Sequence, residues 1–244
     1  MGFKDGFHSS RKEKSPAGQP DWPQGKELAK LQQAGPSAVG GPITVHTYKE
    51  AEIQKAIGWF TSYLHSEREC HYPNGRRLSI EWREMMNGYF APALLEQVRV
   101  VELTDRRLAD PWFYPCAKEK GMRNLPDMTH KAAATFLDVV VFNNGRISSR
   151  DLFHGLVHVA QVNVMGLTEF SELFVRGFLR ARSYFLAPLK AHAFSLDAKF
   201  TAHPGVRFSV EDEVRQWWRA GRYGATGTDG PGRLLVRGRE KRAE

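Results

Sequence analysis

Two histidines four positions apart lie in the middle of a segment that the sequence predicts to be a helix. The segment starts after Ser148 or Ser149, either of which can cap a helix N-terminus, and stops before Gly166, a residue typical of helix C-termini. Residues four apart on a helix project from the same face, so the imidazoles of His154 and His158 can reach one common partner. Other elements must pack around these two imidazoles to complete any site that they form.

The spacing of His154 and His158 is that of the metal ligands in the zinc-peptidase pattern His-Glu-x-x-His. In that pattern a glutamate follows the first histidine and acts as the general base on the metal-bound water. This chain has Gly155 at that position, and a glycine inside a helix costs about 1 kcal/mol relative to alanine. Helix propensity does not explain Gly155, so the sequence predicts a metallohydrolase frame that lacks its base.

A zinc ion in a catalytic site takes three protein ligands and a water, so the histidine pair needs a third ligand. We expect this ligand from a following helix that packs against the first. We favour His192, because Pro188 can open its helix and flanking alanines permit close helix approach. Gln161 is either a hydrogen-bond partner that orients a ligand or simply a helix residue. The other candidate ligands are Glu169, Glu172, Asp197 and His203.

The rest of the pattern predicts a mostly helical protein with a small sheet. Apolar periodicity and capping residues predict further helices over residues 47–65, 80–94, 168–182, 188–200 and 210–220. Within the second of these, Pro92 kinks the helix or ends it early. Strand composition marks residues 98–103 and 135–142, and an aromatic-rich loop is expected between them. We therefore expect an α+β fold that is predominantly helical.

The composition divides the chain into three parts. Residues 1–42 are rich in Gly, Pro and Ser and bury too little apolar surface to offset ordering entropy, so we expect a disordered tail. One turn of helix near residues 27–33 is compatible with this. Residues 43–223 are expected to form a single domain, and residues 224–244 a flexible basic tail.

The net charge of +8 raises the question of a nucleic-acid partner. Six Lys/Arg stand against four Asp/Glu in residues 1–36, and seven against three in residues 219–244, so the ends carry +6 of the +8. No recognition motif accompanies the basic C-terminal end, whose cations are Arg233, Arg237, Arg239, Lys241 and Arg242. We interpret the ends as solvated tails and do not expect nucleic acid as the main partner.

Apolar runs and cysteines bear on location. No apolar run approaches the roughly 20 residues that span a bilayer, and no secretory signal is visible at the start. The two cysteines, Cys70 and Cys116, are too few for a disulfide scaffold and lack the spacing of a zinc ribbon. We expect a cytoplasmic protein with no membrane partner.

A longer stretch, about residues 135–223, resembles an uncharacterised bacterial family of zincin-like metallopeptidases. The family shows a strand, a His-Glu-Leu-Val-His-Val-x-Gln helix, an aromatic-rich helix and a Pro-Leu-Glu-x-x-Ala-Tyr segment. The matching pieces are Leu-Phe-His-Gly-Leu-Val-His-Val-Ala-Gln (152–161), Phe-Val-Arg-Gly-Phe (174–178), Pro-Leu-Lys-Ala-His-Ala-Phe (188–194) and Val-Glu-Asp-Glu-Val (210–214). The resemblance covers a little over a third of the chain and implies a zincin-like active-site helix beside a small sheet.

The chain departs from this family at two positions. The resemblance implies a general base at position 155 and a carboxylate, as the third metal ligand, at position 190, where this chain has Gly155 and Lys190. The second of these is a cation, which repels zinc. The resemblance therefore implies a catalytically inactive pseudoenzyme that retains a peptide or protein partner. The strand before the histidine helix is then expected to be the edge that holds an extended peptide.

Two alternatives stay open. One is an active zinc-dependent hydrolase in which His192 joins His154 and His158, with Glu172 or Asp197 moving the proton. The other is a nucleic-acid-associated protein that acts through its basic tails. Zinc is the cofactor that the histidine pair predicts, although the loss of both acidic residues is compatible with its loss as well.

Overall fold

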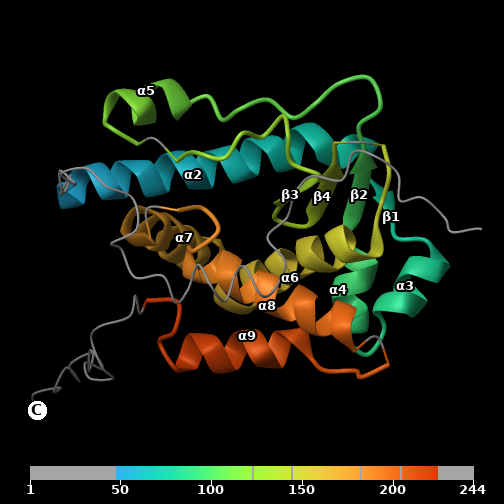
Figure 1. Ribbon diagram of the computed structural model, residues 1–244. Helices are drawn as coiled ribbons and strands as arrows, with labels where there is room; N and C mark the ends of the chain where they lie inside the picture. The colour runs from blue at the N-terminus through green and yellow to red at the C-terminus, as the bar shows by residue number, and fades with distance from the viewer. Residues whose placement is uncertain (1–47, 123, 144, 182, 204, 225–244) are drawn as a thin grey trace, which may run out of the picture. The chain divides into compact units, whose positions relative to one another are not determined.

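The computed structural model describes residues 48–122, 124–143, 145–181, 183–203 and 205–224. Helices predominate and the strands form one small mixed sheet (Figure 1), so the predicted α+β class is confirmed. The predicted N-terminal tail, its helical turn, the first residue of the helix predicted over 47–65 and the basic C-terminal residues lie outside the described part. Within that part, no helix is long and apolar enough to cross a lipid bilayer.

The sheet has four strands in the order β1-β2-β4-β3. β1 (Arg76–Arg77) and β3 (Ala133–Phe136) form its two edges. β2 (Arg99–Glu102) and β4 (Val139–Phe142) run parallel in the centre, and β3 pairs with β4 antiparallel. All four residues of β4 are buried, which suits a run of β-branched and aromatic side chains with a strand on each side.

The stretch predicted as one strand over residues 135–142 is a hairpin, so that prediction was wrong. β3 ends at Phe136, the chain turns at Leu137 and Asp138, and β4 begins at Val139. Leu137 has a φ of 55°, in the left-handed region that non-glycine residues rarely adopt. Arg68 of α2 (Glu50–His71) holds the Asp138 carboxylate with hydrogen bonds of 2.8 and 3.0 Å. The turn contains no glycine, and an arginine distant in the sequence holds it by these two hydrogen bonds.

The helices before the hairpin differ in their bounds from the predicted ones. α2 continues to His71, beyond the predicted end near residue 65. The predicted helix over 80–94 is two helices, α3 (Ile80–Met86) and α4 (Pro92–Gln97). Pro92 begins the second helix because proline suits the first helical position and cannot continue a helix through itself. A short helix, α5 (Tyr114–Glu119), lies in the segment predicted as an aromatic loop.

The helices after the hairpin follow the sequence closely. α6 (Ser149–Met165) begins after Ser148, whose hydroxyl accepts a hydrogen bond from the amide of Asp151 at 3.0 Å, and ends at Gly166. The next helices are α7 (Leu167–Ala181), α8 (Pro188–Ala202) and α9 (Val210–Arg219). All three pack against α6, which also contacts β3 and β4. In Figure 1, α6 thus runs between the sheet and the helices α8 and α9.

Gly155 allows α6 to approach the hairpin closely. A Cβ atom at this buried position would lie 2.8 Å from Cγ1 of Val140 and 3.3 Å from the hydroxyl of Thr135. The Thr135 hydroxyl donates a hydrogen bond to the Gly155 carbonyl at 3.2 Å. Close packing against the sheet therefore explains why position 155 is a glycine. Helix propensity alone does not explain it.

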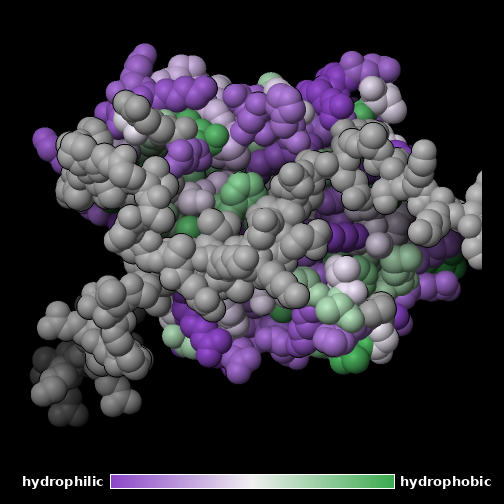
Figure 2. Space-filling model, in the orientation of Figure 1, coloured by the Kyte–Doolittle hydropathy of each residue, from purple (hydrophilic) through white to green (hydrophobic). Residues whose placement is uncertain are grey.

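The exposed apolar side chains of the described part are scattered. On the face shown in Figure 2, hydrophilic residues predominate and hydrophobic ones form separate small patches. The large apolar side chains that are exposed are Ile80, Met85, Trp112, Phe185, Val206 and Trp218. They come from several different elements, so they do not form one large exposed apolar patch.

The close approach at Gly155 makes a stability prediction with a matched control. We expect Gly155→Ala to lower the free energy of unfolding by about 1–3 kcal/mol, because the added methyl group overpacks against Val140. Gly58 in α2 is exposed and has open space around the same position, so Gly58→Ala should stabilise by up to about 1 kcal/mol. Urea unfolding of both variants measures the difference. A stabilising Gly155→Ala would contradict the packing account.

Candidate functional site

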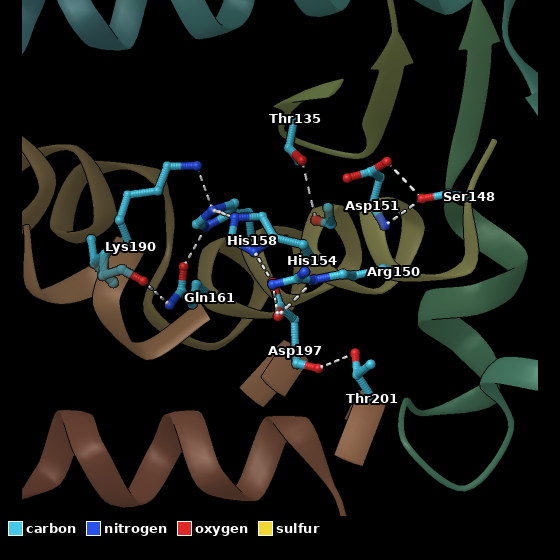
Figure 3. A network of polar contacts seen from close by, with 12 residues as sticks. Thr135, Ser148, Arg150, Asp151, His154, His158, Gln161, Lys190, Asp197 and Thr201 are labelled. Carbon is cyan, nitrogen blue, oxygen red and sulfur yellow. Dashed lines mark hydrogen bonds and ion pairs between the residues drawn. The ribbon is translucent and has the colours of Figure 1, made fainter. Parts of the chain in front are cut away.

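His154 and His158 come together on one face of α6, as their spacing predicted (Figure 3). Their Nε2 atoms are 3.2 Å apart, and His158 is only 5% exposed. Side chains from α8 complete their surroundings, because α8 packs along this face of α6. The pair therefore lies where α6 and α8 meet, and the α8 residues that contact it decide what it can do.

Hydrogen bonds to the Nδ1 atoms set the tautomer of both rings. His154 Nδ1 lies 3.0 Å from the Asp197 carboxylate, and His158 Nδ1 lies 2.7 Å from Oε1 of Gln161. The Gln161 amide nitrogen donates to the Leu189 carbonyl at 3.0 Å, which turns its oxygen towards His158. Each Nδ1 therefore carries a proton, and each Nε2 presents a lone pair. Metal-bound histidines are oriented in the same way, by acceptors on the nitrogen that does not bind the metal.

Lys190 supplies the cation that these lone pairs face. Its Nζ lies 2.6 Å from Nε2 of His158 (Figure 3) and 4.9 Å from the centre of the Tyr184 ring. Because the His158 Nδ1 already donates to Gln161, Lys190 is the donor in its contact with Nε2. The ammonium group thus occupies the position beside the imidazole where a metal ligated by His158 would have to bind.

Burial controls the charges in this cluster. It holds the pKa of both imidazoles well below the usual value for histidine, and the Lys190 cation lowers them further. Burial also lowers the pKa of Lys190 to about 7. It raises the pKa of Asp197 to about 6, against the lowering effect of Arg150, whose Nη2 is 3.0 Å from the carboxylate. At neutral pH the imidazoles are neutral, Asp197 is ionised, and Lys190 is divided between its charged and neutral forms.

The residues around the pair do not complete a zinc site. In the part of the chain that the structure describes, no three His, Cys, Asp or Glu side chains are grouped so that they could hold one ion. Asp197 contacts the Nδ1 side of His154 and not its lone pair. The other candidates make contacts elsewhere: Glu169 with Trp218, and Glu172 with Arg176, while His203 is exposed. The donor set is two imidazoles and a lysine, which does not fit zinc.

His192 is not brought to the pair. Its Nδ1 lies 2.7 Å from the Tyr223 hydroxyl and its ring stacks on Trp217 with centroids 3.9 Å apart. Residues two apart on a helix point about 200° apart, so α8 cannot turn both Lys190 and His192 towards α6. The predicted combination of His192 with His154 and His158 is therefore not formed. The buried Nε2 of His192 lacks a hydrogen-bond partner among the described residues.

Position 155 cannot hold the general base that the resemblance implied. A side chain there would start 2.8 Å from Val140, on the side of α6 that packs against the sheet. The strand expected to hold a peptide is also differently placed. Val139–Phe142 is the inner strand β4, already paired on both sides, and the sheet edge next to it is β3. The prediction that this strand is an edge was wrong, because the hairpin turn was not recognised.

A cavity of about 130 Å³ lies beside His158 and Lys190. Side chains from α2, α5, β3 and α7 line it, and most of them are apolar or aromatic. Its polar lining residues include Lys131 and Tyr184, and the Lys131 ammonium donates a hydrogen bond to the Tyr184 hydroxyl. Sequence reasoning missed both, because neither belongs to a motif and they meet only through the packing of distant segments.

Comparisons with known proteins give no family for this chain. We compared it with protein-family models, with curated proteins and with solved structures, and none of the three comparisons found a match. The resemblance to zincin-like proteins therefore remains a hypothesis based on the residues of the motif and on their geometry.

The lowered pKa of Lys190 makes a prediction about pH. In the unfolded chain a lysine has a pKa of about 10.4, so between pH 7 and 10 the unfolded state holds a proton that the native state has released. The loss of folding free energy caused by the buried ammonium is therefore largest below pH 7, and it becomes smaller as the pH rises. The stability advantage of Lys190→Met over the wild type should therefore shrink from pH 7 to 10, by at most about 1.4 kcal/mol per pH unit.

Urea unfolding of wild type and Lys190→Met over this pH range measures the effect. Lys118→Met, which removes an exposed lysine of α5, is the matched control for the loss of one lysine. A pH-independent difference between wild type and Lys190→Met would show that the Lys190 ammonium is not desolvated in the native state.

Proposed function

We propose that this chain is a non-catalytic relative of metal-dependent peptidases, in which the Lys190 ammonium stands in place of the metal and the adjoining cavity binds a ligand that is not cleaved. The observation that carries the proposal is the distance of 2.6 Å between Lys190 Nζ and His158 Nε2. An ammonium at that distance uses the lone pair with which a histidine would bind a metal ion.

The orientation of the two imidazoles supports this relationship. Both Nδ1 atoms have oxygen acceptors and both Nε2 atoms face the same point, as in the metal sites of hydrolases. Such an arrangement has no evident use in a simple helix packing, because two lone pairs 3.2 Å apart repel each other unless a proton or a cation lies beside them. Lys190 provides that cation from within the chain.

The described residues supply neither a base at position 155 nor a third ligand beside the histidine pair, which argues against an active hydrolase. A metal activates water by lowering the pKa of the water to about 7, which a lysine ammonium cannot do. Gly155 leaves no room for a glutamate, and His192 is occupied by Tyr223 and Trp217. The alternative in which three histidines bind zinc would need α8 to rotate, which would remove Lys190 and Asp197 from their contacts with α6.

For the location of the protein, we propose the cytoplasm. Both Cys70, which is exposed, and Cys116, which is half-buried, are free cysteines. Free thiols persist in reducing compartments, which supports the proposal. No contact of the described residues favours the alternative of a nucleic-acid partner, and the basic C-terminal residues that would carry it lie outside them.

A single substitution should restore metal binding. Lys190→Glu replaces the cation by a carboxylate that faces the lone pairs of His154 and His158, giving the three ligands that zinc requires. We expect Lys190→Glu purified without chelator to hold about one zinc per chain, and to bind added zinc at least 100-fold more tightly than the wild type. Elemental analysis and zinc titration measure both quantities. Lys190→Gln, which removes the charge without adding a carboxylate, is the control and should not gain zinc to this extent.

The wild type decides whether the proposal stands. About one zinc per wild-type chain, lost in His158→Ala, would show that the ammonium does not replace a metal, and the proposal would fail. We also expect no hydrolysis of peptide substrates by the wild type or by zinc-loaded Lys190→Glu, because neither has a base at position 155.

A further inference from the structure

The cavity beside His158 contains two lysines, neither of which has an acidic partner among the described residues. Lys131 contacts the hydroxyl and the ring of Tyr184, and Lys190 contacts His158 and the same Tyr184 ring. Neither ammonium forms an ion pair with a carboxylate of the described residues. Removing a cation from water without a counter-ion costs free energy, so two such cations in one apolar cavity favour the binding of an anion there.

Both cations lie against the ring of Tyr184. The Lys131 Nζ is 3.6 Å from the centre of the Tyr184 ring, and the Lys190 Nζ is 4.9 Å from it. The two charges repel, and each lysine's pKa is lowered by burial, that of Lys131 also by the Lys190 cation. A negative group beside Tyr184 would contact both ammonium groups and relieve their repulsion.

The rest of the cavity lining is mainly apolar. Phenylalanines provide much of it, and the described residues of the lining include no arginine. These aromatic residues are Phe60, Phe113, Phe136, Phe170, Phe174 and Phe178. The cavity, of about 130 Å³, is close in size to an engineered apolar cavity of about 150 Å³ in another protein that takes up benzene, so one ring or a short alkyl chain fits.

We propose that this cavity binds a small apolar carboxylic acid, with its carboxylate between Lys131 and Lys190 and its ring or short chain against the phenylalanines. The assignment rests on the proposed function, since it names the ligand that the non-catalytic site would hold. A carboxylate matches the site better than a phosphate does, because two ammonium donors serve its two oxygens. A phosphate dianion has more oxygens and is usually held by arginines or by a helix N-terminus.

Calorimetric titration with phenylacetate and 2-phenylacetamide tests the proposal at pH 7. The two probes share a ring and differ in charge. We expect phenylacetate to bind wild type with 1:1 stoichiometry and at least tenfold more tightly than the amide. Lys131→Met and Lys190→Met keep the approximate length of the side chain but remove the charge, so each should reduce this preference to threefold or less. Lys118→Met alters an exposed lysine of α5 outside the cavity and should keep the full preference.

Three results would overturn the assignment. Equal binding of the two probes would show an apolar cavity without recognition of charge. No binding of either probe to protein that unfolds cooperatively would show that the cavity does not take a ligand of this class. Tighter binding of N-acetylphenylalanine than of phenylacetate would assign the carboxylate to the end of a peptide and not to a small acid.

Zinc measured on the same wild-type samples separates this inference from the proposed function. If the protein is zinc-free and does not prefer phenylacetate, only the ligand assignment is contradicted. If the protein carries one zinc per chain, the proposed function itself is contradicted, whichever probe binds more tightly.

Discussion

The packing of α6 against the β3–β4 hairpin is the contact on which the site depends. Gly155 has no side chain where a Cβ would lie 2.8 Å from Val140, so the helix rests directly on the strands. With that side of α6 fixed, His154 and His158 lie within reach of Asp197 and Lys190 of α8. The position that a zinc peptidase uses for its base is thus a packing position in this fold. Restoring the base would require moving the helix away from the sheet, and with it the histidines.

The charge beside the histidines links the fold to the proposed role. Lys190 and Asp197 are seven residues apart on α8, two helical turns, so they project from the same side and reach His158 and His154 respectively. One residue supplies a cation for the lone pairs and the other an acceptor for a ring proton. An ammonium can interact with the imidazole lone pairs as a metal ion does, but it does not activate water. The proposed site can therefore bind a ligand without cleaving it.

Much of the fold could be predicted because its signals are local. The start and end of α6 follow from Ser148 and Gly166, and α8 begins at a proline, each through contacts within a few residues. The hairpin was not predicted, because Leu137-Asp138 is not one of the strong two-residue turn pairs such as Asn-Gly or Asp-Gly, and the contact of Asp138 with Arg68 is not visible in the local sequence. A continuous apolar run looks the same whether it is one strand or two.

The sequence by itself determined that His154 and His158 share one face of a helix, since that follows from the period of the helix. It also identified Lys190 as a cation at a position where the resemblance implied a carboxylate. Only the tertiary structure decided that Lys190 and not His192 faces the pair, because the rotation of α8 is set by its packing against α6 and α7. It alone brought Lys131 and Tyr184 to the same cavity, since contacts between distant segments depend on the packing of the whole core and leave no local pattern.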